Sequence, residues 1–334
     1  MKVLVTGATG FVGSHAVRAI DAAGHDLRLL VRDPAKARAL LGEAADRCDL
    51  VVGDVTDPAT VGAAIDGCDA VVHAAAMVAL HRRQAAEAHR TNTVAAANVL
   101  GAAARAGCDP IVHVSSVSVL QSTPPLTTID APLRQSTNGY SASKVDCEWM
   151  CRGMQAAGVP VATIYPSAVT GPDSPSVTAV HTMAISSTRS MPMTSSGFNL
   201  IDVRDLAAMV AAMLEPGHGP RRIMAGGHYL PWAQFLDVCD EVRGRHVRRY
   251  PAPGAALRGV GRLVDLTHLR LPVDFELSHE TMVEATQACP YDSTANELEL
   301  GVTLRPVADT MRDTYRWLHQ AGHITAHDAG ACAS

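Results

Sequence analysis

Tyr140 and Lys144 stand four residues apart in the stretch NGYSASKVDCE (138–148), where a helical pattern begins. Four residues is slightly more than one helical turn, so the two side chains project from the same face of a helix. A phenol and an ammonium on one face are suited to proton transfer with a single substrate. Because such a pair also arises by chance in a long chain, the hypothesis depends on the elements that surround it.

The surrounding sequence alternates between short apolar runs and longer alanine-rich stretches. The apolar runs have the length of strands and the stretches between them have the length of helices, as in KVLVTG, SHAVRAIDAAG and LRLLVRD near the start. This alternation predicts βαβ units and a parallel sheet. We therefore expect an α/β fold with a doubly wound parallel sheet of the Rossmann type.

The alternation breaks after Gly171, returns for the stretch NLIDVRDLAAMVAAMLE, and breaks again from about residue 227. This pattern predicts a smaller, discontinuous C-terminal substrate domain near the carboxyl ends of the strands. The expected boundaries are 1–169 and 199–226 for the Rossmann domain, 170–198 and 227–325 for the substrate-binding domain, and 326–334 for a disordered tail.

Composition excludes several classes of protein. The 334 residues are 47% hydrophobic and 18% charged, with a formal net charge of -5, so the chain suits a globular protein and has no electrostatic footprint for nucleic acid. No apolar run reaches the length of a membrane span, and the basic run RGRHVRR (243–249) is expected to be a solvated face.

The reactive residue types outside the Tyr-Lys pair do not form a recognisable site. The eight cysteines are scattered without a CxxC motif or a signal peptide, which favours reduced thiols and a cytoplasmic location. The chain has 15 histidines, but the spacings of His81, His89, His228 and His279 match no set of metal ligands. We expect no metal.

A glycine-rich turn follows the first strand. The sequence TGATGFVG places Gly7, Gly10 and Gly13 in a GxxGxxG spacing ahead of a helix. Glycine permits a tight turn and a close backbone approach, and the N-terminus of a helix offers free N–H groups to a pyrophosphate. In this position the motif predicts a dinucleotide site. The expected binding residues in the turn are Gly7, Thr9, Gly10, Phe11, Val12 and Gly13.

The end of the second strand indicates which dinucleotide binds. An NAD site usually has an acidic residue there, whereas this chain has Arg32, with Lys36 close behind. Because a guanidinium pairs with a 2′-phosphate, we favour NADP(H). The alternative is that Asp33 binds the ribose while Arg32 lies on the adenine, which would give an NAD(H) site.

Two later strand ends complete the expected cofactor site. The sequence GDV puts Asp54 and Val55 at the end of the third strand, within reach of an adenine edge. The small side chains of Ala74, Ala75 and Ala76 follow the fourth strand, where the backbone must pass close to the cofactor, although they also suit packing under a helix.

These motifs, taken in order, resemble those of the extended short-chain dehydrogenase/reductases, in the NAD-dependent epimerase/dehydratase superfamily. The resemblance covers residues 1 to about 210 and rests on TGATGFVG, GDV, HAAA, Asn92 in RTNTVAAANVL, the serines at 115 and 116, YSASK and YPSAVTGP. It implies that Tyr140 is the catalytic acid/base, that Lys144 binds the cofactor ribose and lowers the Tyr140 pKa, and that Ser116 hydrogen-bonds the reacting oxygen. It further implies cofactor contacts for Asn92, Pro166 and Ser167.

Elementary chemistry agrees with these roles. A free phenol has a pKa near 10, and a nearby ammonium and a cationic nicotinamide stabilise its ionised form at neutral pH. Ser116 follows the strand PIVHVSS, at the carboxyl end of the sheet where open α/β folds bind ligands. Its neighbour Ser115 is the competing candidate.

Four departures from sugar-modifying members bear on the substrate. The acidic pair that follows the catalytic serine or threonine in sugar 4,6-dehydratases is absent after Ser115 and Ser116. Nucleotide-sugar members usually have Asn where this chain has Pro166 and Ser167. They also have an Arg that helps hold the diphosphate where this chain has Phe198, and a His where it has Asp202. The elements VRDP, YPS and LIDVRDLA look more like dihydroflavonol-4-reductase-like and 3-beta-hydroxysteroid-dehydrogenase-like proteins, whose substrates are hydrophobic. The expected lining segments are 77–83, 117–126 and 182–193.

The sequence therefore predicts an NADP(H)-dependent enzyme that interconverts a hydrophobic alcohol and a ketone or aldehyde. One alternative is a redox-neutral nucleotide-sugar epimerase of the same superfamily, and another is a non-catalytic NADP-binding sensor. The family also suggests a homodimer through the Tyr140 helix and the helix TNTVAAANVLGAAARA, although these small residues would equally permit burial within a monomer.

Overall fold

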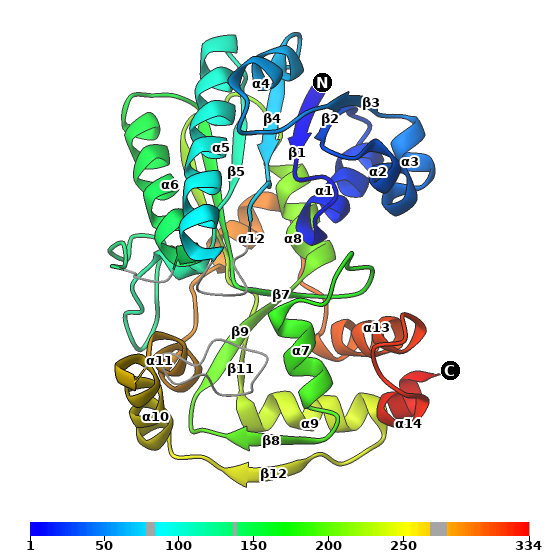
Figure 1. The fold of residues 1–334 in the computed structure, drawn as a ribbon, viewed down its shortest axis with the longest axis vertical. Helices are drawn as coiled ribbons and strands as arrows, with labels where there is room; N and C mark the ends of the chain where they lie inside the picture. The colour runs from blue at the N-terminus through cyan, green and yellow to red at the C-terminus, as the bar shows by residue number, and fades with distance from the viewer. Residues whose placement is uncertain (78–83, 136–138, 268–278, 334) are drawn as a thin grey trace.

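A seven-stranded parallel sheet forms the upper part of the molecule in the computed structural model, which describes residues 1–77, 84–135, 139–267 and 279–333 (Figure 1). The strand order is β10-β6-β5-β4-β1-β2-β3, and every neighbouring pair is parallel. The strands are β1 (Lys2–Thr6), β2 (Asp26–Val31), β3 (Asp49–Val52), β4 (Ala70–His73), β5 (Ile111–Val114), β6 (Val161–Pro166) and β10 (Arg221–Ala225).

Helices cover both faces of this sheet, so its strands carry mostly apolar residues. One face packs against α1 (Phe11–Ala22) and α8 (Val203–Ala212), and the other against α4 (Pro58–Ile65), α5 (Ala85–Ala106) and α6 (Gly139–Ala156). The short helices α2 (Pro34–Leu41) and α3 (Glu43–Asp46) complete the first layer. This arrangement confirms the predicted doubly wound fold.

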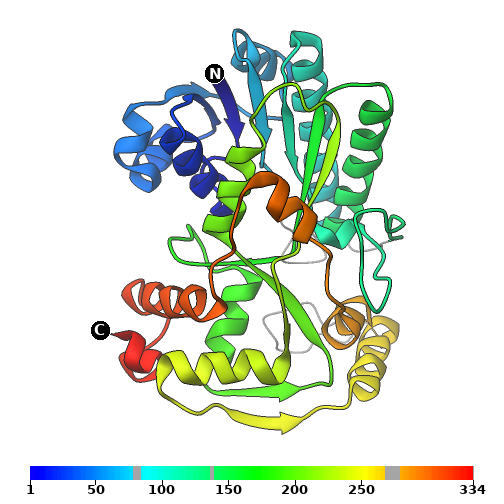
Figure 2. The ribbon, with the colours of Figure 1, turned by 180° about the vertical axis from the view of Figure 1, so that it is seen from behind.

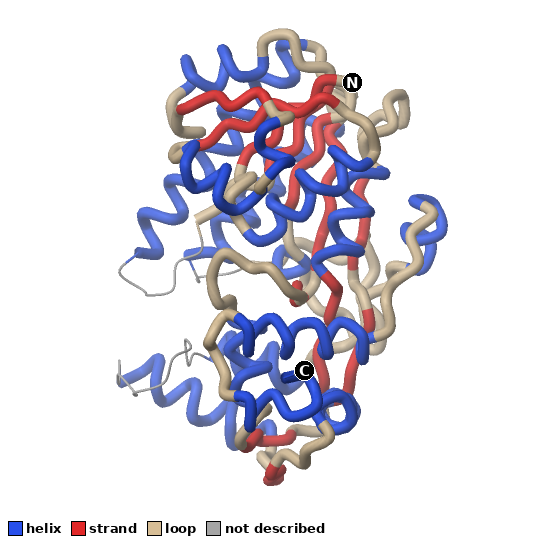
Figure 3. Tube along the Cα trace, turned by 90° about the vertical axis from the view of Figure 1, so that its right-hand side faces the viewer, coloured by secondary structure: helices blue, strands red, loops and turns tan. Residues whose placement is uncertain are grey.

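The lower part of the molecule is built from segments that leave the carboxyl ends of the strands (Figures 1 and 3). It contains a three-stranded sheet, β11-β9-β7, and a two-stranded sheet, β12-β8. The bounds are β7 (Ala168–Thr170), β8 (Ser190–Met193), β9 (Gly197–Asp202), β11 (His228–Pro231) and β12 (Arg248–Pro251). Its helices are α7 (Ala179–Ser186), α9 (Trp232–Arg243), α10 (Gly254–Thr267), α11 (His279–Gln287), α13 (Val307–Gln320) and α14 (Ala326–Ala329), with the 3₁₀ turn η3 (Gly330–Ala333). The 3₁₀ turn η2 (Val117–Val119) and helix α12 (Thr294–Leu300) instead contact the upper part.

Segment 294–304 lies on the first part rather than the second. Helix α12 contacts β10 and α8, as Figure 2 shows from behind, and the side chains of Leu300 and Leu304 pack against the core under α1 and α8. Strand β9, conversely, is the middle strand of the smaller sheet. Both segments therefore depart from the boundaries expected from the sequence.

The predicted disorder of the tail was wrong. Residues 326–333 form α14 and η3, and the side chains of Ala329 and Cys332 are buried in the core of the lower part. The Sγ of Cys332 donates to the carbonyl of Val242 at 3.1 Å. Small residues look disordered by composition, but here they permit the tail to pack closely on α9.

The expectation of a solvated face at 243–249 was wrong for its first residue. Arg243 is 1% exposed, donates to the carbonyl oxygens of Cys239, Ser187 and Asp328, and lies 5.2 Å over the Tyr315 ring. The hydrogen bonds and the aromatic face compensate for burying the guanidinium.

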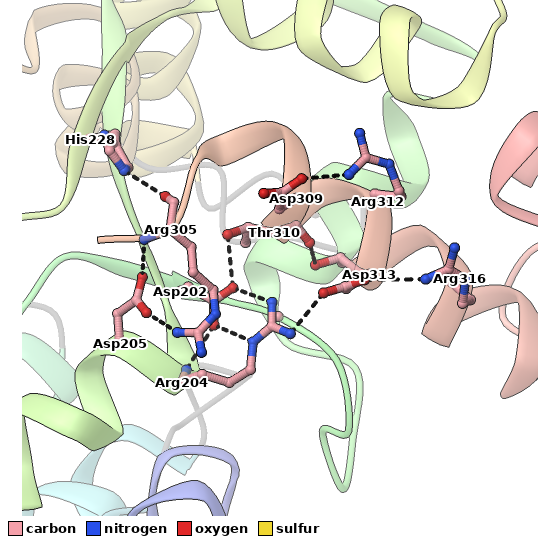
Figure 4. A network of polar contacts seen from close by, with 12 residues as sticks. Asp202, Arg204, Asp205, His228, Arg305, Asp309, Thr310, Arg312, Asp313 and Arg316 are labelled. Carbon is pink, nitrogen blue, oxygen red and sulfur yellow. Dashed lines mark hydrogen bonds and ion pairs between the residues drawn. The ribbon is translucent and has the colours of Figure 1, made fainter. Parts of the chain in front are cut away.

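A polar network joins the two parts (Figure 4). Asp202 caps α8, accepts two hydrogen bonds from the Arg204 guanidinium and one from Thr310, and Arg204 reaches Asp313 on α13 at 2.7 Å. Burial disfavours ionisation of Asp202, but the hydrogen bonds from Arg204 outweigh it and lower the carboxyl pKa. The network fixes α13 against the start of α8.

No helix among the described residues is both long and apolar enough to cross a bilayer.

Candidate active site

The glycine turn between β1 and α1 is packed so closely that side chains would not fit. A Cβ on Gly7, which has a φ of 78°, would lie 2.6 Å from the backbone carbon of Ala74. A Cβ on Gly13 would lie 2.1 Å from the carbonyl oxygen of Gly7. The turn therefore lies against the start of the HAAA segment, and α1 approaches β1 closely, as a dinucleotide turn requires.

The start of α1 suits an anion. Gly10 caps the helix without a side chain, no acidic residue occupies the first turn, and the first N–H groups lack helical partners. Three residues that were predicted to bind the cofactor lie here: Thr9 is in the glycine turn, and Phe11 and Val12 are the first two residues of α1. Ser167 directly follows β6, and its Oγ is buried without a hydrogen-bond partner in the described part of the chain. The close glycine turn and the open start of α1 fit the pyrophosphate of a nicotinamide dinucleotide. The cofactor contact of Ser167 stays a prediction.

The charged side chains that follow β2 differ in whether the chain itself binds them. The Asp33 carboxylate caps α2 by accepting the Lys36 N–H at 3.0 Å, whereas the side chains of Arg32 and Lys36 are exposed. The carboxylate is thus engaged by the chain itself, and two cations remain at the surface beside it.

The other predicted cofactor residues occupy the expected strand ends. Asp54 accepts two hydrogen bonds at 2.8 Å from the backbone and side chain of Thr56, and these lower the carboxyl pKa. Val55 follows it, half-buried, and the carbonyl of Val55 accepts from Asn98. Ala74 and Ala75 are half-buried beside Gly7, and Ala76 is exposed.

Asn92 connects the segment after the alanines to α6. Its buried amide accepts from the N–H of Met77 at 2.7 Å, donates to the carbonyl of Met77 at 3.0 Å and donates to the Oγ of Ser143 at 3.0 Å. All three contacts are to the chain. A cofactor contact by Asn92, which the resemblance implies, stays a prediction.

Lys144 is held inside the protein. Its side chain is 5% exposed, and its Nζ donates to the carbonyl of Val114, the last residue of β5, at 2.8 Å. Tyr140 lies in the first turn of α6, one turn before Lys144, and its side chain is outside the described residues. The helix that the sequence predicted for this pair is present.

The two serines after β5 face different partners. The Oγ of Ser115 is buried and donates to Glu148 at 3.5 Å, on the α6 side. The Oγ of Ser116 accepts the N–H of Ser118 at 3.1 Å, which leaves its own proton available for a substrate oxygen. This difference favours Ser116 over Ser115 as the catalytic serine, although the role itself is still a prediction.

A cavity of about 740 Å³ adjoins this segment. Its lining comes from η2 and the following loop, the end of β6, β9, and α11 with the residues after it. The lining residues are Val117, Ser118, Leu120, Gln121, Ser122, Pro124, Arg134, Ser167, Ala168, Phe198, Asn199, Val283, Glu284, Gln287, Ala288 and Tyr291. Arg134 and Glu284 are the charged members of this lining, and they form an ion pair with each other.

The expected lining segments had different outcomes. Residues of segment 117–126 line the cavity, although a substrate contact by them stays a prediction, and most of segment 77–83 lies outside the described residues. The prediction for 182–193 was wrong: Met183, Met191 and Met193 pack in the core of the lower part. Residues 283–291, which line the cavity instead, were missed because no motif or strand-and-helix rhythm marks them.

The model of the NAD dependent epimerase/dehydratase family matches residues 3–226. The chain belongs to this family. It is therefore an extended short-chain dehydrogenase/reductase, an NAD(P)-dependent enzyme that acts on CH–OH or carbonyl groups of a small molecule.

Similar proteins agree with this assignment. "Sterol demethylase protein B" of Methylococcus capsulatus is 25% identical over 97% of this chain and 100% of its own length. A "putative dihydroflavonol 4-reductase" of Synechocystis is 25% identical over 96% of this chain and 95% of its own. The crystal structure of gox2253 is similar with a TM-score of 0.83 and 27% identity, over 97% of this chain and 99% of that one.

Proposed function

We propose that the protein is an NADP(H)-dependent reductase that interconverts an uncharged, hydrophobic ketone or aldehyde and the corresponding alcohol. The observation that carries this proposal is the cavity beside η2: its two charged side chains neutralise each other, and the rest of its described lining is apolar or uncharged. A nucleotide diphosphate would need unpaired cations there, because burying its charge without them is costly.

The proposed reaction divides the chemistry between cofactor and chain. A bound nicotinamide supplies the hydride in reduction and accepts it in oxidation. Tyr140 donates its phenolic proton to the substrate oxygen as negative charge develops there, and the Ser116 hydroxyl donates a hydrogen bond to the same oxygen. Lys144, held by the Val114 carbonyl, places a positive charge one helical turn from Tyr140 and favours its ionised form.

The first test is loss of absorbance of the reduced nicotinamide, with NADPH and NADH run separately. Steroid ketones, flavonoid ketones, aldehydes and nucleotide sugars form the substrate panel. We expect stoichiometric oxidation of NADPH with one class of uncharged carbonyl compound. Isomerisation of a nucleotide sugar without net oxidation would instead establish the epimerase function and refute the reductase proposal.

We propose that NADP(H) is preferred because Arg32 and Lys36 are exposed at the end of β2 while Asp33 is engaged in capping α2. Replacing Arg32 with alanine should weaken NADPH binding about tenfold, since a charge-assisted contact to the 2′-phosphate is lost, and should leave NADH binding unchanged. Fluorescence titration of both cofactors measures this. Arg38→Ala, an exposed cation on α2, is the control and should alter neither affinity; equal losses for NADPH and NADH in Arg32→Ala would contradict the assignment.

We also propose a homodimer through α5 and α6. Trp149 on α6 is 62% exposed and Val94 on α5 is 38% exposed, so this face presents large apolar side chains to solvent. Replacing Trp149 with glutamate should weaken dimerisation about 100-fold, because the proposed interface would bury the indole ring and the variant would bury a charge in its place. Analytical ultracentrifugation measures the change. A wild-type protein that sediments as a monomer at all concentrations would refute the dimer.

A further inference from the structure

A row of aromatic rings joins the lower part of the molecule to the start of α1. The ring of Phe11, the first residue of α1, lies 5.2 Å from the ring of His181 on α7, measured between centroids. The His181 ring in turn lies 4.9 Å from the ring of Trp317 on α13. Helices α7 and α13 belong to the lower part and lie below α1 in Figure 1. Phe11 therefore connects the glycine turn to the lower part.

The orientation of the His181 ring is fixed by two hydrogen bonds. Its Nδ1 accepts the N–H of Thr178 at 3.2 Å, and its Nε2 lies 3.0 Å from the carbonyl oxygen of Gly171. Because the backbone N–H only donates and the carbonyl only accepts, the ring is neutral and carries its proton on Nε2. Burial lowers the pKa of His181, which agrees with a neutral ring. Both nitrogens are engaged within the chain, so His181 acts on its surroundings through packing.

Phe11 is held on a second side by its own helix. The ring of His15, one turn further along α1, packs edge-on against Phe11 with the centroids 5.4 Å apart. The backbone N–H of Phe11 is among the first of α1, and these lack helical partners and are available to an anion. A binding group that is ordered before its ligand arrives does not lose that conformational freedom on binding, which increases affinity.

We propose that His181 is a positioning residue for the cofactor, because its packing on Phe11 holds the first turn of α1 in the conformation that binds the pyrophosphate. This inference rests on the cofactor site proposed at the glycine turn and is independent of the identity of the substrate. The part of the molecule that is expected to bind the substrate would then also determine how tightly the cofactor binds.

The experiment compares NADP⁺ with adenosine 2′-monophosphate, which keeps the adenine, the ribose and the 2′-phosphate but lacks the pyrophosphate. Both dissociation constants are measured by calorimetry on the full-length protein. We expect His181→Ala to weaken NADP⁺ binding about tenfold and to change the affinity for adenosine 2′-monophosphate less than about twofold. His181→Gln keeps a donor for the Gly171 carbonyl but has no ring, so it should show the same selective loss, and it serves if the alanine variant does not fold.

Ser187→Ala is the matched control for a change within the lower part. Ser187 is buried like His181, lies at the other end of α7, and its hydroxyl bonds the Tyr315 hydroxyl. This variant should lower the Tm but leave both dissociation constants unchanged. Equal losses for the two ligands in His181→Ala, or unchanged affinity for NADP⁺, would show that His181 has only a structural role and would overturn the inference.

A double-mutant cycle with Phe11→Ala tests whether His181 acts through Phe11. If it does, adding His181→Ala to Phe11→Ala should weaken NADP⁺ binding less than about twofold further. A further tenfold loss would overturn this route. Unchanged NADP⁺ affinity in Phe11→Ala would refute the proposed cofactor site at the start of α1 as well, whereas a loss in Phe11→Ala without one in His181→Ala would overturn only the role of His181. If the wild type binds NAD⁺ instead, the same comparison is made with NAD⁺ and adenosine.

Discussion

Replacing Tyr140 with phenylalanine is expected to lower kcat for carbonyl reduction about 10³-fold while leaving the affinity for NADPH within about threefold. Phenylalanine keeps the ring but cannot donate a proton, and a positioned general acid contributes about 10² to 10⁴ in rate. Cofactor binding should persist, because the glycine turn and the start of α1 are unchanged. The role proposed for Tyr140 agrees with its place on α6, because Lys144 lies one turn further along the same helix and its Nζ donates to the carbonyl of Val114 at the end of β5.

The measurement is steady-state turnover with saturating NADPH, together with a separate fluorescence titration of the cofactor. Tyr250→Phe is a matched control: Tyr250 lies on β12, is 46% exposed and is not among the cavity-lining residues. It should retain wild-type kcat. If Tyr140→Phe retains full activity, Tyr140 is not the acid, and a non-catalytic role for the Tyr-Lys pair would follow.

The first 170 residues were predictable because local chemistry and global fold agree there. The strands are short, mostly apolar runs, most of the helices are rich in alanine, and glycine occurs where the turn leaves no space for a Cβ, as at Gly7 and Gly13. Where local preference and tertiary structure agree in this way, the sequence pattern predicts the fold correctly. Ser115 and Ser116 could not be told apart from the sequence, since only the fold places Glu148 beside one of them.

The lower part was less predictable because tertiary contacts outweigh composition there. The methionines at 183, 191 and 193 suggested an adaptable substrate wall, yet they fill the core between α7, β8 and neighbouring helices. Arg243 sits in a basic run but is buried, and the carbonyls that bind it come from residues 56 and 85 positions away as well as from its own helix. Partners so distant in sequence leave no local pattern.

Two histidines occupy the interior of the main sheet without being used by the proposed mechanism. His73 on β4 pairs in register with His113 on β5, and their rings stack with centroids 5.4 Å apart. The Oγ1 of Thr6 bonds the Nδ1 of His73 at 2.7 Å, while both ring nitrogens of His113 lack a partner in the part of the chain that the structure describes. Burial lowers the pKa of His73 to about 3 and that of His113 well below its usual range, and the charge of Lys144 lowers both further.

These shifts predict that the folded protein loses stability as the pH falls below about 6.5. The unfolded chain binds a proton at each histidine near that pH, whereas the folded protein keeps both rings neutral, so the unfolded state binds more protons and acid favours it. Each histidine then contributes a slope of about 1.4 kcal/mol per pH unit. For the pair, the free energy of unfolding should fall by about 4 kcal/mol between pH 7.5 and 5.0, a range in which ordinary carboxyl groups remain ionised in both states.

Urea unfolding at pH 7.5, 6.5, 5.5 and 5.0 measures this dependence. His113→Leu should remove about half of the contribution that the pair makes to this fall, and at pH 7.5 it should be at least as stable as the wild type, because it replaces a buried ring with two unpaired nitrogens by an apolar side chain. His218→Gln, on a surface turn after α8, should leave the slope unchanged. A wild-type stability that is flat from pH 7.5 to 5.0 would mean that His73 and His113 accept protons in the folded state, and that the sheet interior admits charge beside Lys144.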